Sequence, residues 1–203
     1  MSWSFPIAKI AGTQLRIHVT FFLLIIWVGV ATYLSSGWTG AVFGVAFILT
    51  LFLCVILHEF GHALMARRFG VETPDITLLP IGGLARLQRI PREPRKELLI
   101  AIAGPMVNIV IAVILFLFLF LGKESPDLAI DLEEHTLRGF FISLMVVNVW
   151  LVVFNMIPAF PMDGGRVFRA FLAMFLPYSR ATSIAATVGQ SLALGGVFFG
   201  FMY

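Results

Sequence analysis

Five long apolar stretches constrain this chain more than any other feature of its sequence. They cover residues 17–34, 39–57, 98–121, 137–157 and 181–203, and a helical pattern continues from the second stretch to about Arg68. About 20 apolar residues suffice for a helix to cross the hydrocarbon core of a bilayer. Apolar residues make up 60% of the 203 residues, and charged residues make up 12%. In soluble domains about 45–50% of the residues are apolar and about 25% are charged. The sequence therefore predicts an all-α integral membrane protein, a polytopic bundle of five transmembrane helices, or six if a further span follows.

The positions of the charged residues predict how these spans are oriented. The connection between the second and third stretches is basic, with Arg67, Arg68, Arg86, Arg89, Arg92, Arg95 and Lys96. Basic residues favour the cytoplasmic ends of spans, and the connection between the third and fourth stretches is acidic. We therefore expect a cytoplasmic amino terminus and cytoplasmic ends for the second and fourth spans. Because the basic residues flank apolar stretches, the net charge of +3 indicates membrane topology and no nucleic-acid partner.

The basic connection also contains a segment, Val71 to Leu87, that is less polar than a solvated loop. Its hydrophobic residues surround Pro80 and the pair Gly82 and Gly83, and they alternate only in part. Partial alternation around a glycine turn favours a β-hairpin or a re-entrant segment that packs against the helices on the cytoplasmic side. An interfacial loop is the alternative, and the sequence leaves both open.

The second apolar stretch leads into His58, Glu59, Phe60, Gly61 and His62, an H-E-x-x-H motif. Histidines four positions apart lie on one face of a helix, so both imidazoles can bind one Zn²⁺ while the glutamate lies beside an open coordination position. Ionisable groups that adjoin a span are costly and need a shared reason, which a metal ion supplies. The alternative is an interfacial cluster satisfied by water. The motif predicts one zinc ion per chain, with Glu59 as the catalytic residue.

A catalytic zinc site has a third protein ligand, and Asp163 is the best candidate for it. Asp163 follows the fourth span on the cytoplasmic side and precedes Gly164 and Gly165, which allow the chain to turn back toward His58. An ordinary Asp-Gly turn is the alternative. Cys54 is eight residues from His62, about 12 Å along a helix, and is expected to be a buried small hydrophobe. The remaining candidates are less suitable by position: His18, His135, Glu72 and Asp75.

These motifs together resemble the site-2 protease family of intramembrane zinc metalloproteases. The resemblance rests on H-E-x-x-H at 58–62, on Gly104, Pro105 and Asn108 in the next span, and on Asn155, Pro158, Asp163 and Gly164. It implies that zinc is bound by His58, His62 and Asp163 and that Glu59 is the catalytic acid and base. It also implies that Asn155 and Pro158, with Asn108, hold the substrate or shape the site. From the chemistry alone, Asn155 either donates a hydrogen bond to the oxyanion or satisfies backbone groups where a helix is broken.

Family members often carry a further span and appended regulatory domains. Here we expect a single transmembrane metalloprotease domain over residues 1–203, with a catalytic core at about 39–166 and no appended soluble domain. One cysteine excludes an internal disulfide. We expect a multi-pass protein of a prokaryotic cell membrane, with its active site toward the cytoplasm.

The leading interpretation is an intramembrane zinc metalloendopeptidase that acts in regulated intramembrane proteolysis. It would hydrolyse peptide bonds in or near the transmembrane segment of a single-span membrane protein substrate. The alternative from another class is a metal-binding transporter that uses His58, Glu59 and His62. A transporter would place further ionisable groups along its spans, and the first, third and fifth stretches nearly lack them.

Overall fold

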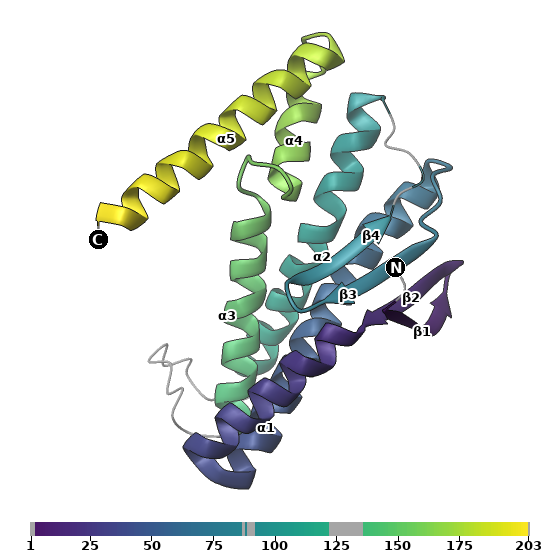
Figure 1. Ribbon diagram of the computed structural model, residues 1–203. Coiled ribbons are helices and arrows are strands. Elements are labelled where there is room, and N and C mark those ends of the chain that lie inside the picture. The colour runs from purple at the N-terminus through teal and green to yellow at the C-terminus, as the bar shows by residue number, and fades with distance from the viewer. Residues whose placement is uncertain (1–2, 87, 89–91, 122–135, 203) are drawn as a thin grey trace.

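The computed structural model describes residues 3–86, 88, 92–121 and 136–202 (Figure 1). Its elements follow one another in the order β1 (Ser4–Ile10), β2 (Thr13–His18), α1 (Val19–Arg68), β3 (Asp75–Leu79), β4 (Gly82–Arg86), α2 (Pro94–Leu121), α3 (Leu137–Asn155), α4 (Asp163–Leu172) and α5 (Tyr178–Met202). Within this range α1, α2, α3 and α5 are long and apolar enough to cross a membrane. The chain is therefore a multi-pass membrane protein, as its hydropathy predicts.

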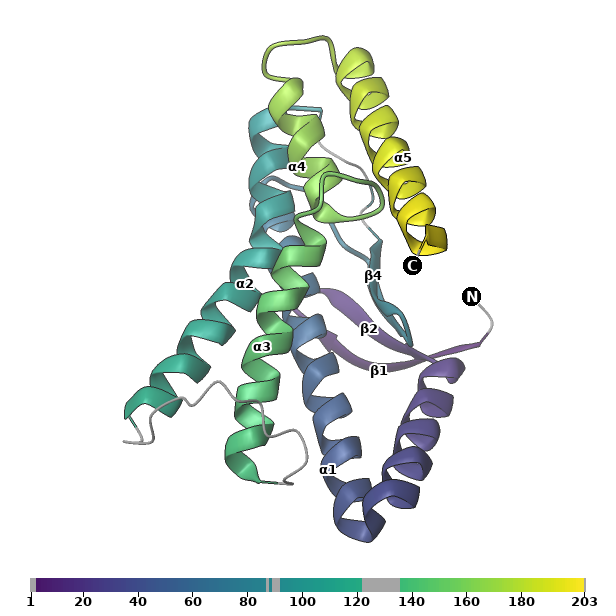
Figure 2. The same cartoon turned by 90° about the vertical axis from the view of Figure 1, so that its left-hand side faces the viewer.

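Helix α1 accounts for the first two predicted spans. Its 50 residues are interrupted at Ser36 and Gly37, which have non-helical backbone angles, and Gly37 has a φ of +64°. The chain reverses direction there, so α1 is a hairpin of two arms (Figure 2). Glycines let the arms approach closely, because a Cβ atom on Gly44 would lie 2.7 Å from the side chain of Thr32. The described part of the chain thus has four membrane-capable helices, one of which covers two of the five predicted spans.

A four-stranded sheet lies beside the second arm of α1 (Figure 1). The strand order is β1-β2-β3-β4, with β2 and β3 parallel and the other two pairs antiparallel. Strands β3 and β4 form the hairpin that was one of the two interpretations of Val71 to Leu87, and the interfacial loop is excluded for residues 75–86. The prediction of an all-α fold is wrong at the amino terminus, which forms β1 and β2. Because β2 pairs with β3 across the whole of α1, no local sequence pattern reveals that pairing.

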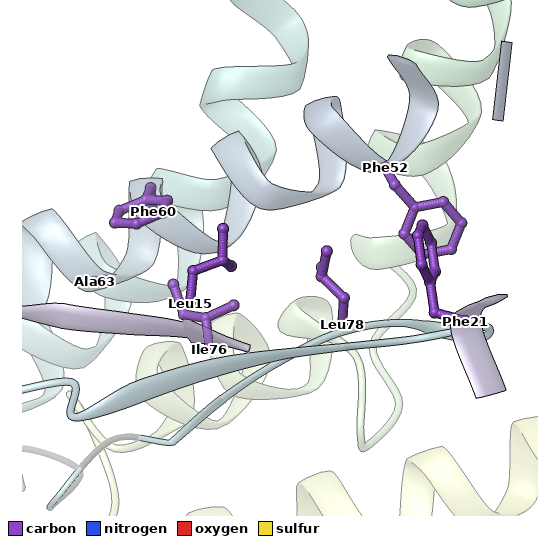
Figure 3. Close-up of a cluster of buried hydrophobic side chains, with 7 residues drawn as sticks. All are labelled: Leu15, Phe21, Phe52, Phe60, Ala63, Ile76 and Leu78. Carbon is purple, nitrogen blue, oxygen red and sulfur yellow. The ribbon is translucent and has the colours of Figure 1, made fainter. Parts of the chain in front are cut away.

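A hydrophobic cluster holds the sheet against α1 (Figure 3). The cluster consists of Leu15, Ile76 and Leu78 from the strands and Phe21, Phe52, Phe60 and Ala63 from α1. The rings of Phe21 and Phe52 meet edge to face with their centroids 4.6 Å apart, which joins the start of the first arm to the second arm. Phe60 and Ala63 alternate along α1 with His58 and His62. The packing that anchors the sheet therefore also fixes the helical face on which the histidines lie.

Candidate metal centre

Three buried side chains bring one donor atom each to a common point. His58 and His62 belong to the second arm of α1, and Asp163 is the first residue of α4. The Nε2 atoms of the two histidines are 3.1 Å apart. Oδ2 of Asp163 lies 3.1 Å from Nε2 of His58 and 3.0 Å from Nε2 of His62. The structure thus brings together the three residues that the sequence suggested as ligands.

The size of this triangle matches a metal ion. Ligand atoms about 2.0 to 2.1 Å from a tetrahedral zinc ion are separated from one another by about 3.4 Å. Among the residues that the structure describes, His58, His62 and Asp163 form the group of His, Cys, Asp or Glu side chains that could hold an ion. Two imidazoles and one carboxylate are a donor set typical of hydrolytic zinc sites, so the residues fit such an ion.

The second nitrogen of each imidazole has its own acceptor. Nδ1 of His58 lies 2.5 Å from Oδ1 of Asn108, and Nδ1 of His62 lies 2.7 Å from the carbonyl oxygen of Ile100. Because both partners are acceptors, each Nδ1 must carry the hydrogen, and each Nε2 then directs a lone pair at the common point. This is the arrangement by which proteins orient metal-binding histidines.

Helix α2 approaches the imidazoles at a glycine. A Cβ atom on Gly104 would lie 2.2 Å from Nε2 of His62 and 2.7 Å from Nε2 of His58. On the facing helix, a Cβ atom on Gly61 would lie 2.7 Å from the carbonyl oxygen of Ala103. Small residues at both positions therefore let α1 and α2 cross closely enough for α2 to supply the acceptors of both imidazoles.

Asp163 is presented by a tight turn between α3 and α4. A Cβ atom on Gly164 would lie 2.3 Å from the carbonyl oxygens of Met156 and Ile157, so this close approach requires glycine. Burial acts to raise the pKa of the Asp163 carboxyl, but its contacts with His58 and His62 outweigh burial and hold the pKa below its ordinary value. The side chain is therefore an anion, as a metal ligand must be.

A buried ion pair ties α4 to α2. The Nε and Nη2 groups of Arg169 both donate to Oε1 of Glu97, with Nε at 2.8 Å. The guanidinium also lies over the rings of Phe160 and Tyr178, at 5.2 Å and 5.3 Å from their centroids. Glu97 is one turn before Ile100, so this contact joins the helix that carries Asp163 to the helix segment that orients His62.

Glu59 directly follows the candidate ligand His58 and lies against strand β4. It is half-buried, and a Cβ atom on Gly83 of β4 would lie 2.6 Å from its Cγ atom. Strand β4 therefore passes directly over the glutamate of the H-E-x-x-H motif, and the absence of a side chain at Gly83 allows it. The outer edge of β4 has no neighbouring strand in the described sheet.

The other candidates from the sequence have different surroundings. Asn108 is fully buried behind His58, and the side chain of Asn155 donates to the carbonyl oxygen of Leu151 at 2.9 Å, which ties the end of α3. Pro158 is exposed in the turn before α4. The weaker ligand candidates lie apart from the triad: Cys54 is buried, His18 caps α1, Asp75 pairs with Arg86, and Glu72 accepts from Gln88. His135 lies outside the described residues.

Sequence reasoning missed four contributors to the site: the Ile100 carbonyl, Asn148, Glu97 and Arg169. A backbone carbonyl leaves no signal in a sequence. Asn148, however, is a polar residue in the middle of an apolar span, and such residues are rare and usually functional. Glu97 likewise stands out as an acidic residue where an apolar span begins.

Fold and site together define a multi-pass helical membrane protein with a buried triad of two histidines and one aspartate and a glutamate beside it. Residues 46–196 match the family described as peptidase family M50. These residues are most of the chain, so the chain belongs to peptidase family M50. The resemblance to the site-2 protease family that its motifs indicated is confirmed.

Individual relatives agree with this assignment. A zinc metalloprotease of Methanocaldococcus jannaschii is 38% identical over 203 residues, which are 100% of this chain and 55% of that protein. Stage IV sporulation protein FB of Bacillus subtilis is 31% identical over 169 residues, 82% of this chain and 51% of that protein. The chain thus spans about half the length of these curated relatives. The solved structure of a site-2 protease from M. jannaschii matches with a TM-score of 0.65 and 34% identity, over 98% of this chain and 86% of that one.

Proposed function

We propose that this chain is an intramembrane zinc metalloendopeptidase that hydrolyses peptide bonds in or near the transmembrane segments of single-span membrane proteins. The observation that carries the proposal is the triangle of His58, His62 and Asp163, with Glu59 on the same helical turn and apolar helices around it. Membership of peptidase family M50 and relatives that are zinc metalloproteases support it. A transporter is disfavoured because the described spans hold few ionisable groups apart from this cluster.

In this proposal His58, His62 and Asp163 hold one zinc ion per chain. Zinc in such a site lowers the pKa of water and polarises a carbonyl group. Glu59 takes a proton from the attacking water and delivers it to the leaving amine, a role that requires a carboxylate within reach of both groups. Asn108 and the Ile100 carbonyl keep the two imidazoles turned toward the ion. The Asn155 amide nitrogen donates one hydrogen to the carbonyl oxygen of Leu151 and retains a second hydrogen, which serves as a neutral donor to the oxyanion.

The substrate segment reaches the site as an extended strand. A transmembrane helix has no free peptide groups, so it must unwind locally before a carbonyl can approach the zinc. In the sheet as the structure describes it, strand β4 passes over Glu59 and has a free edge for such a segment. The other free edge, on β1, carries Pro6 and an irregular register between Pro6 and Ala8, both of which discourage strand addition.

The same proposal includes the topology of the chain. Both arms of α1 cross the bilayer, so α1, α2, α3 and α5 make five crossings. Members of the family often carry a further span. Arg67 and Arg68 end α1, and the following connection is basic, which supports a cytoplasmic site. The archaeal and bacterial relatives support a prokaryotic cell membrane.

The decisive experiment compares wild type with Glu59→Gln in detergent. We expect wild type to bind one zinc ion and to cleave a single-span reporter, while Glu59→Gln retains the zinc and loses cleavage by about 100-fold or more, because general acid–base catalysis contributes about 10²–10⁴. Glu93→Gln, which removes an exposed carboxylate paired with Lys96, is the matched control and should cleave normally. Retained cleavage in Glu59→Gln would refute the assignment of Glu59. Wild type that binds zinc and carries ions across liposomes without cleaving would favour the transporter.

A further inference from the structure

A directed chain of hydrogen bonds runs from the metal centre to helix α3. Oδ1 of Asn108 accepts from Nδ1 of His58 at 2.5 Å, and Nδ2 of Asn108 donates to Oδ1 of Asn148 at 2.8 Å. Nδ2 of Asn148 in turn donates to the carbonyl oxygen of Leu144 at 2.8 Å. Both asparagines are 0% exposed. Every link therefore points the same way, away from His58.

The Leu144 carbonyl sets this direction. A backbone carbonyl can only accept, so the Asn148 amide must turn its nitrogen toward Leu144 and its oxygen toward Asn108. That oxygen can only accept, so Asn108 must turn its nitrogen to Asn148 and its oxygen to His58. His58 must then place its hydrogen on Nδ1, which leaves Nε2 free to bind a metal.

Without Asn148, the chain of hydrogen bonds no longer fixes which end of the Asn108 amide faces His58. The two ends of an asparagine side chain have nearly the same shape, so the amide could turn and offer its nitrogen to Nδ1 of His58. A donor at that position favours the tautomer with its hydrogen on Nε2, which cannot bind a metal. The contacts of Asn108 with His58 and Asn148 alone do not distinguish its two ends, whereas the Leu144 carbonyl does.

We propose that Asn148 is a positioning residue that fixes the tautomer of His58 through Asn108 and thereby strengthens metal binding. The inference rests on the zinc site of the proposed function and adds a residue that does not touch the ligands. It also explains why a second asparagine is buried in an apolar span, where an unneeded amide would be unfavourable.

The test measures zinc affinity of the full chain in detergent by competition with a chelating dye. Asn148→Leu should bind zinc about 10–100-fold more weakly than wild type, the range seen when partners of metal ligands are removed. Adding Asn108→Asp to Asn148→Leu should restore most of that loss. A carboxylate accepts through either oxygen, so it holds the hydrogen on Nδ1 of His58 without help from Asn148.

Two further variants separate this role from packing. Ile142→Ala removes a buried side chain from the same helix without touching the hydrogen-bond chain, and it should leave zinc affinity unchanged. Asn148→Ala, which cannot overfill the site, should weaken zinc binding as Asn148→Leu does.

The outcomes are distinguishable. Wild-type affinity in both Asn148 variants would refute the inference, and so would a loss that Asn108→Asp does not restore or that Ile142→Ala reproduces. A wild-type protein that binds no zinc would instead refute the proposed function on which the inference rests.

Discussion

Gly104 offers the sharpest test of the metal centre, because a single methyl group there would occupy the space between the two imidazoles. The Cβ atom of an alanine would lie 2.2 Å from Nε2 of His62 and 2.7 Å from Nε2 of His58. Neither imidazole is free to retreat, since His62 is held by the Ile100 carbonyl and His58 by Asn108.

The expected magnitude follows from these distances. Ordinary van der Waals contact begins at 3.4 Å, so the nearer nitrogen must move by about 1.2 Å, whereas metal–ligand distances vary by only about 0.2 Å. Zinc binding should therefore weaken by about 100-fold or more, which corresponds to about 2.7 kcal/mol. Alanine favours a helix over glycine by about 1 kcal/mol, so α2 itself should not be weakened by its backbone.

The assay compares zinc affinity and helical content of Gly104→Ala with those of wild type. The matched control is Gly195→Ala in α5, where a new Cβ atom meets nothing within 4 Å. We expect the control to bind zinc as wild type does. Gly104→Ala that keeps zinc affinity within about threefold of wild type would refute the geometry of the site, because two ligands cannot both reach an ion past that methyl group.

Two further predictions concern the ion pair and the sheet edge. Arg169→Leu leaves Glu97 buried without its partner and should lower the free energy of unfolding in mixed micelles by about 3–5 kcal/mol. The double variant Arg169→Leu with Glu97→Leu should recover most of this loss. Equal losses in the single and the double variant would contradict a stabilising ion pair. Successive N–H groups of a strand point to opposite edges. Of the two variants Leu84→Pro and Ala85→Pro, one therefore removes an N–H group that points away from β3 and leaves the hydrogen bonds between β4 and β3 intact. That variant should retain zinc and cleave the reporter at least about tenfold more slowly, and undiminished cleavage by both would refute strand addition at β4.

Much of the site is local in sequence and could be predicted for that reason. His58 and His62 share a helical face because any α-helix places residues i and i+4 on the same side. The apolar stretch before them predicts that helix. Asp163 was a ligand candidate because it follows a span and precedes two glycines, and the resemblance to the site-2 protease family favoured it over an ordinary turn. Gly164 lies against the carbonyls of Met156 and Ile157. The roles of Asn108 and Asn148 were not recognisable, because they depend on which residue of a neighbouring helix each amide meets.

The sequence by itself determined the apolar spans, the face of α1 that carries the two histidines and a chain bend before Asp163, since hydropathy and helical periodicity act over a few turns. The tertiary structure decided which segments meet. It merged two stretches into the α1 hairpin, paired β2 with β3 across that hairpin, placed Gly83 over Glu59 and set Asn148 behind Asn108. These contacts join residues far apart in the chain. They follow from close packing of whole helices and from the need to satisfy buried polar groups, and no local pattern records either requirement.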